Sequence, residues 1–263
     1  MDQIKAQSML SYEIDAPAWL RDAGPWPADE VIAARNGVFH LPSIGAGKQH
    51  QIPPTPKLFT TAALDYDVSL DAPRPDALFA FLGQLWPDDQ QSIESLQEWF
   101  GYLLSADTSQ QKILFLVGPK RSGKGTIARL IRGLIGPSNV AGPTLAGLAT
   151  NFGLSPLLGK SVAIIPDARL SGRSDRAIVI ERLLSISGED TLTVDRKYRD
   201  PVTTKLATRL VLVSNELPRL SDASGALASR LIVLRLTVSR WEGMKPSPSG
   251  ETFRYTMVHG ELP

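Results

Sequence analysis

Short apolar runs alternate with amphipathic helical patterns along the second half of the chain. Four predominantly apolar runs have the length expected of strands that are buried on both faces, and they occupy residues 112–117, 161–166, 209–214 and 230–236. Apolar residues recur at helical spacing between them, over residues 127–135 and 175–186. This alternation predicts an α/β core with a largely parallel sheet, which we place at residues 111–237.

Two helices are expected immediately before this core. Apolar side chains recur at helical spacing from Asp76 onwards, and Trp86-Pro87-Asp88-Asp89 interrupts the pattern once. The positions that carry the pattern are Leu78, Phe79, Leu82, Leu85, Ile93, Leu96, Trp99, Phe100 and Leu103. We therefore expect a small helical domain over residues 76–110.

The two ends of the chain lack the alternation of strand and helix patterns that the middle shows. Residues 1–75 are rich in proline, and Asn36-Gly37 lies between two apolar segments, which is typical of a tight β-hairpin. We expect a β-containing region there. Residues 238–263 have no helical periodicity, and we expect an irregular tail.

Composition limits the partners and the compartment. The formal net charge of the 263 residues is +1, so any contact with nucleic acid must depend on a local basic patch. The chain has no cysteine, which excludes disulfides and thiolate metal sites, and we expect a reducing cytoplasm. No run approaches the roughly 18 apolar residues that a membrane span needs, so we expect no membrane partner.

The stretch GPKRSGKGT directly follows the first predicted strand of the core and precedes a helical pattern. Glycines five residues apart, followed by a lysine, form a phosphate-binding loop in this context, because backbone N–H groups surround the phosphates and the lysine neutralises their charge. The alternative is a strand-to-helix turn with an incidental lysine. The predicted nucleotide-binding residues are Gly118, Pro119, Lys120, Arg121, Ser122, Gly123, Lys124, Gly125 and Thr126.

The loop departs from the usual pattern at one position. Gly125 stands where a serine or threonine normally follows the lysine, and the hydroxyl is displaced to Thr126. One residue along a helix is a rotation of about 100°, so ligation of Mg²⁺ by Thr126 is an open question at this stage. We expect Mg²⁺ as a cofactor, held near Thr126 and Asp167.

Three polar residues follow the loop at the ends of predicted elements. Asp167 ends the second strand of the core, where a carboxylate can orient magnesium through a water, or can simply cap the next helix. Asn215 ends the third strand, where an amide can hold the attacking water or the γ-phosphate, or can merely terminate the strand. Arg230 precedes the last strand, and it is either an arginine finger for a neighbouring subunit or the partner of a surface acid. Their order after Lys124 is that of an oligomeric P-loop ATPase.

A basic β-hairpin is predicted between Asp167 and Asn215. Residues 195–209 hold five basic side chains against two acids. Lysine and arginine suit the phosphates of single-stranded DNA, and an aromatic ring can stack on a base. The alternative is a solvated hairpin. The predicted DNA-binding residues are Arg196, Lys197, Tyr198 and Arg199.

Three segments together give a specific resemblance: GPKRSGKGTIARL, DARLSGRSDRAIVIERLLSISGEDTLTVDRKYRD and SNELPRLSDASGALASR. Over roughly residues 30–237 the chain resembles the phage/plasmid-type primase/helicase family, which is part of helicase superfamily 3. The resemblance implies an AAA+-like P-loop core that forms a ring, usually a hexamer, and hydrolyses ATP while it moves along single-stranded DNA. No polymerising primase domain precedes the core, so priming by this chain alone is not expected.

The resemblance also implies roles for individual residues. These are Lys124 and its loop for ATP, Asp167 as the metal-associated acid, Asn215 as the sensor, Arg230 as a finger given in trans, and Arg196 and Lys197 as DNA contacts of a pore hairpin.

Two other functions fit part of the sequence. The GKGT variant of the loop also resembles nucleoside monophosphate kinases of the adenylate-kinase type, which need an arginine-rich lid over the transferred phosphate. The chain could also be a truncated DNA-binding remnant without catalytic activity.

Overall fold

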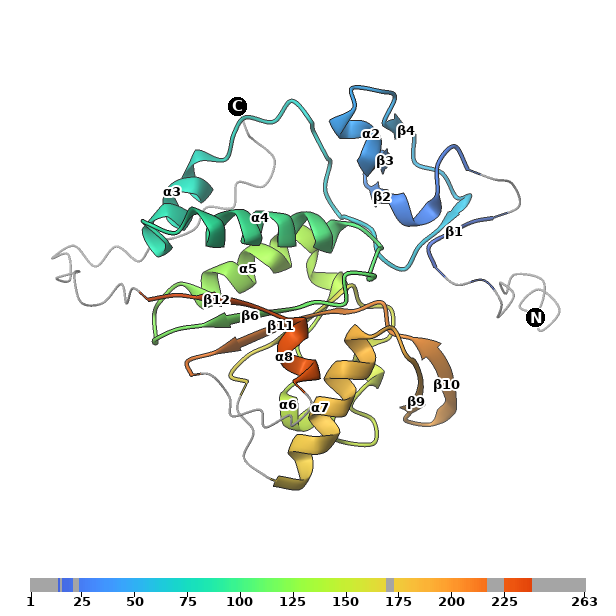
Figure 1. The fold of residues 1–263 in the computed structure, drawn as a ribbon. Helices are drawn as coiled ribbons and strands as arrows, with labels where there is room; N and C mark the ends of the chain where they lie inside the picture. Colours follow the sequence, from blue (N-terminus) through green and yellow to red (C-terminus); the bar gives the residue numbers. More distant parts are fainter. Residues whose placement is uncertain (1–13, 15, 21–23, 169–172, 217–224, 238–263) are drawn as a thin grey trace, which may run out of the picture.

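A five-stranded parallel sheet forms the centre of the protein (Figure 1). We describe the protein from a computed structural model, which describes residues 14, 16–20, 24–168, 173–216 and 225–237. The strands, in the order in which they lie side by side, are β12 (Leu231–Arg235), β6 (Ile113–Val117), β11 (Arg209–Ser214), β8 (Val162–Ile165) and β7 (Val140–Ala141). All four pairings between them are parallel, which confirms the predicted α/β core with a parallel sheet.

Helices cover both faces of this sheet (Figure 1). One face carries α3 (Asp76–Leu85), α4 (Gln90–Leu104) and α5 (Lys124–Ile135). The other face carries α6 (Leu145–Leu148), α7 (Arg173–Ser187) and α8 (Ala226–Arg230). Every side chain of β6 is buried, because its alternate residues pack against the two layers of helices. This is why the strand has no polar position.

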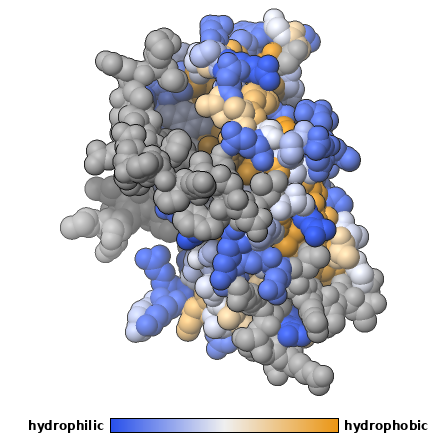
Figure 2. All heavy atoms as spheres, turned by 90° about the vertical axis from the view of Figure 1, so that its left-hand side faces the viewer, coloured by the Kyte–Doolittle hydropathy of each residue, from blue (hydrophilic) through white to orange (hydrophobic). Residues whose placement is uncertain are grey.

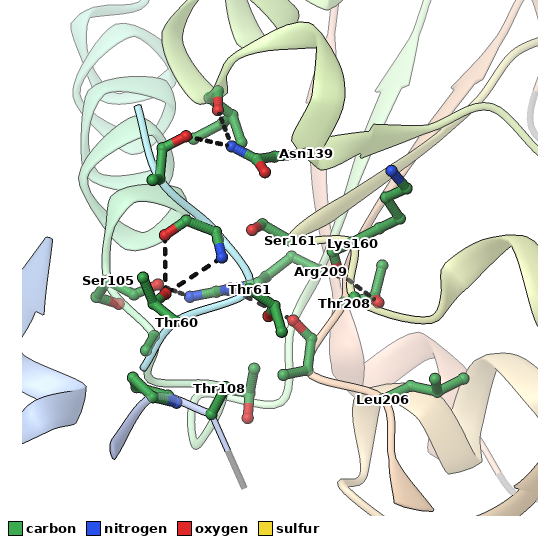
Figure 3. A pocket seen from close by; sticks show the side chains of 18 of the residues that line it. Thr60, Thr61, Ser105, Thr108, Asn139, Lys160, Ser161, Leu206, Thr208 and Arg209 are labelled. Carbon is green, nitrogen blue, oxygen red and sulfur yellow. Dashed lines mark hydrogen bonds between the residues drawn. The ribbon is translucent and has the colours of Figure 1, made fainter. Parts of the chain in front are cut away.

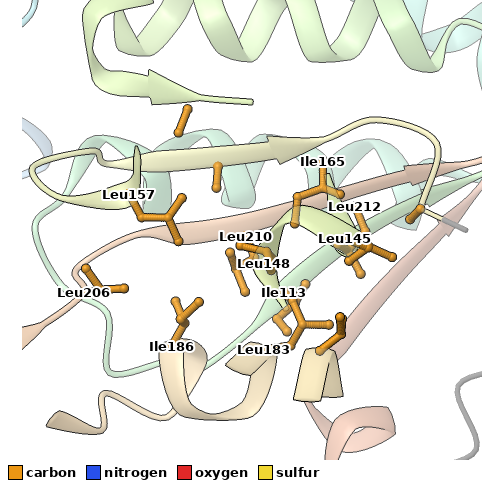
Figure 4. Close-up of a cluster of buried hydrophobic side chains, with 14 of the residues drawn as sticks. Ile113, Leu145, Leu148, Leu157, Ile165, Leu183, Ile186, Leu206, Leu210 and Leu212 are labelled. Carbon is orange, nitrogen blue, oxygen red and sulfur yellow. The ribbon is translucent and has the colours of Figure 1, made fainter. Parts of the chain in front are cut away.

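Two large hydrophobic clusters hold the three layers together. Leu114 and Leu116 point to the face of α3, α4 and α5, whereas Ile113 and Phe115 point to the face of α6, α7 and α8. Figure 4 shows the second cluster, in which Leu183 of α7 lies against the sheet. Alternate residues of each strand therefore pack in different clusters. If a strand shifted by one residue against its neighbour, the side chains of its two faces would exchange places.

The two predicted helices before the core exist with the expected break between them. Asp89 starts α4, because its carboxylate accepts hydrogen bonds from the backbone N–H and the hydroxyl of Ser92 at 3.0 and 2.6 Å. Trp86 lies in the break, and its indole N–H donates to the carbonyl of Arg235 at 2.8 Å. Helices α3 and α4 share one hydrophobic cluster with the sheet, and the domain boundary near residue 110 stays a prediction.

The N-terminal region is β-containing, as predicted. Its elements are β1 (Ala18–Trp19), η1 (Ala28–Glu30), β2 (Val31–Ala34), β3 (Gly37–His40), α2 (Leu41–Gly45), β4 (Gln51–Ile52) and β5 (Leu58–Phe59). The hairpin between β2 and β3 is present, but its turn is Arg35-Asn36, one residue earlier than expected. Gly37 instead begins β3. The position requires a glycine, because a Cβ atom there would lie 2.7 Å from the carbonyl oxygen of Ile52 on β4.

Short elements complete the described chain. They are η2 (Pro137–Asn139), η3 (Ser155–Leu157), β9 (Thr191–Arg196) and β10 (Arg199–Lys205). The antiparallel pair β9 and β10 is the predicted basic hairpin. The predicted tail over residues 238–263 lies outside the described residues. No helix in the described ranges is long and apolar enough to cross a bilayer.

Candidate functional site

The candidate site lies at the carboxyl edge of the sheet, where three neighbouring strands end. Ser214 is paired with Val117 on β6, and the pairing of β11 with β8 ends at Leu212 and Ile165. The backbone N–H of Ala168, which follows Asp167, donates to the carbonyl of Val213 at 2.9 Å. Adjacent strands lie about 4.8 Å apart. Gly118 and Asn215, one residue further, therefore stand side by side, with Asp167 roughly 10 Å from Gly118. The backbone thus gathers the predicted loop, acid and amide at one edge.

Two glycines of the 118–126 loop are required by packing. A Cβ atom on Gly118 would lie 2.3 Å from the carbonyl oxygen of Leu236, where the end of β12 passes. Gly123 has φ of 96°, and a Cβ atom there would lie 2.8 Å from Leu85 of α3. Helix α3 and strand β12 therefore fix the backbone of the loop from two sides.

The Lys124 amine is buried inside the loop and forms hydrogen bonds to other residues of the loop. Only 7% of the residue is exposed, and its Nζ atom donates to the carbonyls of Gly118 and Pro119, each at 2.6 Å, and to the Ser122 hydroxyl at 3.2 Å. Burial lowers the pKa of the Lys124 amine below its ordinary value. All three acceptors are neutral, so the oxygens of a phosphate would be stronger partners for this amine.

The start of α5 also fits an anion. Gly123 gives the helix no side-chain cap, and the first turn contains no acidic residue. Uncapped N–H groups and the positive end of the helix dipole favour a phosphate at this point. The residues present therefore fit a nucleotide, with Lys124 and the loop amides as its phosphate ligands.

The two predicted magnesium ligands occupy different surroundings. Thr126 lies on α5, and its hydroxyl accepts a hydrogen bond from Arg129 at 3.0 Å. Asp167 is exposed at the end of β8 and has φ of 50°. A left-handed aspartate is uncommon, and such conformations concentrate at functional sites. A Mg²⁺ ion in this class of site takes its ligands from one or two protein oxygens and from nucleotide phosphates.

Asn215 is half-buried directly after β11. The carbonyl of the preceding Ser214 accepts a hydrogen bond from the backbone N–H of Gly118 at 3.3 Å. The strand that ends in Asn215 therefore lies between the strands that lead to the loop and to Asp167.

Arg230 lies at the opposite, amino edge of the sheet. It precedes Leu231, which is paired with Ile113 at the start of β6. Five residues of strand, about 16 Å, separate this level from the loop at the end of the same strand. Its Nη1 atom donates to the carbonyl of Leu184 at 2.6 Å and to the hydroxyl of Ser187 at 2.9 Å, in the last turn of α7. Arg230 thus caps α7 and cannot reach the loop of its own chain.

The basic hairpin also stands at the amino edge, because it connects the end of α7 to the start of β11 (Figure 1). Tyr198 forms its tip, with 92% exposure and φ of 59°. The Lys197 amine lies 5.1 Å from the centre of the Tyr198 ring. The Nε atom of Arg196 donates to the carbonyl of Asp200 at 2.8 Å, so this residue also holds the turn. Arg199 is exposed at the start of β10.

One basic residue near the candidate site was not predicted. Arg235 is exposed at the end of β12 and is paired with Val117, one residue before the loop. Its backbone carbonyl also accepts the hydrogen bond from the indole N–H of Trp86. The signal in the sequence is a charged residue near the end of an apolar run.

The described surface on the side of the carboxyl edge is largely hydrophilic (Figure 2). Apolar residues show between the hydrophilic ones in a central band of this view.

Comparison with known proteins supports the fold. A family model described as "Family of unknown function (DUF5906)" matches residues 116–230, less than half of the chain. An A-form apo structure of the C-terminal region of NrS-1 is similar with a TM-score of 0.54 and 19% identity, covering 69% of this chain and 42% of that chain. A second apo structure of that region gives a TM-score of 0.54 and 19% identity, over 75% of this chain and 49% of that one.

A structure of the JCV helicase with a bound compound matches at 19% identity and a TM-score of 0.41, over 60% of this chain and 43% of that chain. This last likeness is too low to carry an argument. The two NrS-1 structures show a shared fold, and this chain spans less than half of their length.

We expect Lys124→Ala to remove most ATP binding while the protein stays folded. The substitution deletes the amine that would neutralise the β- and γ-phosphates. It also removes three hydrogen bonds and the cost of burying a charge, and these two effects on stability oppose each other. We therefore expect the free energy of unfolding to change by less than about 1 kcal/mol. Calorimetric titration with ATP and thermal unfolding measure the two effects. Lys112→Ala, at the other end of β6, is the control and should bind ATP normally. Unchanged ATP affinity in folded Lys124→Ala would contradict the assignment of the loop.

Proposed function

We propose that this chain is the ATPase module of a superfamily 3 DNA helicase from a phage or plasmid replication protein. In this proposal it hydrolyses ATP and moves along single-stranded DNA as part of a ring, most simply a hexamer. The observation that carries the proposal is the division of the sheet into two edges. The carboxyl edge holds a loop fitted to phosphates with Asp167 and Asn215 beside it, and the amino edge holds an exposed basic hairpin.

The carboxyl edge supplies the groups for hydrolysis. In our proposal Lys124 and the amides at the start of α5 hold the phosphates of ATP, and Asp167 orients Mg²⁺ through a water. Bound Mg²⁺ neutralises charge on the transferred phosphate. Asn215, between the loop and Asp167, holds the attacking water by its amide. The base that takes the proton of this water is unassigned, because Ala168 replaces the usual second acid.

The position of Arg230 supports a ring in this proposal. A finger must reach the phosphate that leaves, and Arg230 lies a full strand length from the loop of its own chain. It can serve as a finger only for a neighbouring subunit. Half-buried against α7, it would have to exchange two hydrogen bonds for the neighbour's phosphate.

The position of the hairpin also bears on the kinase alternative. The arginines of a kinase lid touch the transferred phosphate, and this hairpin lies at the edge away from the loop. The basic hairpin therefore fits a DNA contact and does not fit a lid. An ATPase assay with and without a single-stranded oligonucleotide tests the proposal, because a kinase would depend on a nucleoside monophosphate and a remnant on neither.

We expect Lys197→Ala and Tyr198→Ala each to reduce DNA stimulation of the ATPase and to leave basal hydrolysis unchanged. Loss of one phosphate contact at Lys197 should lower the slope of log affinity against log salt by roughly 0.7, and loss of stacking at Tyr198 should cost about 1 to 3 kcal/mol of DNA binding. These side chains are preferable to Arg196, whose removal also loosens the turn. Lys48→Ala, another exposed lysine, is the control. A wild-type rate that does not respond to DNA would argue against a helicase.

We expect Arg230→Ala to lose turnover by about a thousandfold while it still binds ATP, as for other arginine fingers. Mixing it with Lys124→Ala should restore part of the activity, because a mixed interface can join an intact loop to an intact finger. Ser187→Ala is the matched control, since it removes one partner of Arg230 but keeps the guanidinium. If Ser187→Ala loses as much turnover as Arg230→Ala, the arginine is only a cap of α7.

We expect Gly125→Ser to lower the magnesium concentration needed for half-maximal hydrolysis. The serine would restore the hydroxyl at the usual position, and a Cβ atom there meets nothing closer than the Nη1 atom of Arg129 at 3.8 Å. One added oxygen ligand of about 0.5 to 1.5 kcal/mol corresponds to a shift of about two- to tenfold. Gly133→Ser, at another open position of α5, should leave the requirement unchanged. An equal shift in both variants would exclude a role of position 125 in metal binding.

A further inference from the structure

A cavity of about 460 Å³ lies at the amino edge of the sheet, and no residue of the 118–126 loop lines it. Figure 3 shows Thr60, Thr61, Ser105 and Arg209 among the residues around it. Its walls are the extended segment around Thr60 and Thr61, the end of α4, the residues before β8, and the base of the basic hairpin. This volume is in the range of sites for small organic molecules. Nothing in the proposed ATPase mechanism uses this cavity.

Arg209 lines the cavity and is unusual in its burial. Only 5% of the residue is exposed. Its Nη2 atom donates to the carbonyls of Tyr102 at 3.4 Å and Asp107 at 3.2 Å, and also to that of Ser105. Its Nε atom is buried without a hydrogen-bond partner. Among the described residues, no carboxylate lies within 4 Å of this guanidinium. The Asp107 carboxylate attracts it from further away, and the centre of the Tyr102 ring lies 5.3 Å from its Cζ atom.

A buried charge of this kind is costly. Carbonyl groups carry no net charge, and burial lowers the pKa of Arg209 below its ordinary value. One explanation is that Arg209 caps the carboxyl end of α4, where a cation is favourable. That explains the contacts of Nη2. It does not explain the cavity beside the side chain.

We propose that this cavity binds a small organic molecule with one anionic group, for which Arg209 is the charge partner. A carboxylate or phosphate ester would give the guanidinium the counter-charge that its carbonyl partners do not supply. Apolar walls suit a ring-sized body, and they include Leu103, Ile135, Leu157 and Leu206.

The other charged groups around the cavity limit the charge of the ligand. Glu189 lines it with a carboxylate that accepts a hydrogen bond from the hydroxyl of Thr108. The amine of Lys160 is turned to the carbonyl of Ser138 at 2.6 Å. Lys205 also lines the cavity and is exposed at the end of β10. Among the described lining residues, Arg209 is the one buried cation, so the interior of the cavity favours a single anionic group over a polyphosphate such as ATP.

The probes are three molecules of similar size: 2-naphthoate, 2-naphthyl phosphate and the neutral 2-naphthalenemethanol. Calorimetric titration of the full chain should show saturable binding of at least one anion, about tenfold or more tighter than the alcohol. The better of the two anions identifies a carboxylate or a phosphate site. Saturating ATP should not displace it, because the cavity lies at the other edge of the sheet.

Two variants and one control variant locate the binding. Thr61→Trp fills the cavity from an exposed wall position and should weaken anion binding by about tenfold or more, whereas Thr150→Trp, exposed and outside the cavity, should not. Arg209→Gln should remove the preference for the anions over the alcohol. If Arg209→Gln does not fold, Thr61→Trp alone decides. Absence of saturable binding, equal binding of anion and alcohol, or full binding by Thr61→Trp would each overturn the proposal.

Discussion

The register between β6, β11 and β8 is the constraint on which the rest of the structure depends. Each of these strands has a neighbour on both sides, and their alternate residues are committed to two different hydrophobic clusters. A slip of one residue would turn both sets of side chains to the wrong layer. The same register fixes which residues leave the sheet together, and so it brings Gly118, Asn215 and Asp167 to one edge.

A parallel sheet also separates two kinds of chemistry along its strands. Every strand starts at one edge and ends at the other, so residues that precede strands gather about 16 Å from those that follow them. Arg230 and the hairpin precede strands of this sheet and Arg209 begins one, whereas the 118–126 loop, Asp167 and Asn215 follow strands. Helix α7 begins a few residues after Asp167, and its other end bonds Arg230 and leads into β9. Helix α7 therefore joins the two edges, and in the proposed function it is a continuous element between the ATP site and the DNA site.

The sequence predicted the elements well because their signals are local. Apolar runs and helical spacing identified the large strands and helices of the core, and the break at Trp86 was correct. The two-residue strand β7 is not predicted, because Val140–Ala141 is too short to show an alternation of apolar and polar residues. The hairpin turn lies one residue earlier than the Asn-Gly pattern predicts, and Gly37 lies against β4. This contact is with Ile52, fifteen residues further along the chain, and a local pattern does not contain it.

Polar side chains were harder to predict, because their meaning depends on distant partners. The loop was recognisable, since its amides, its glycines and Lys124 are close in sequence. In the sequence, Arg209 is one of five basic residues in the segment 195–209, and nothing local separates it from the other four. Its burial depends on carbonyls at the end of α4, about a hundred residues earlier. A guanidinium at the start of an apolar strand looks like a solvated strand end, and it becomes a buried cation only when another helix ends over it. The same reasoning applies to Arg230. Its place at the amino edge follows from the parallel topology, because it directly precedes β12. Its two hydrogen bonds to Leu184 and Ser187 depend on how α7 packs beside it, and no local sequence pattern contains that packing.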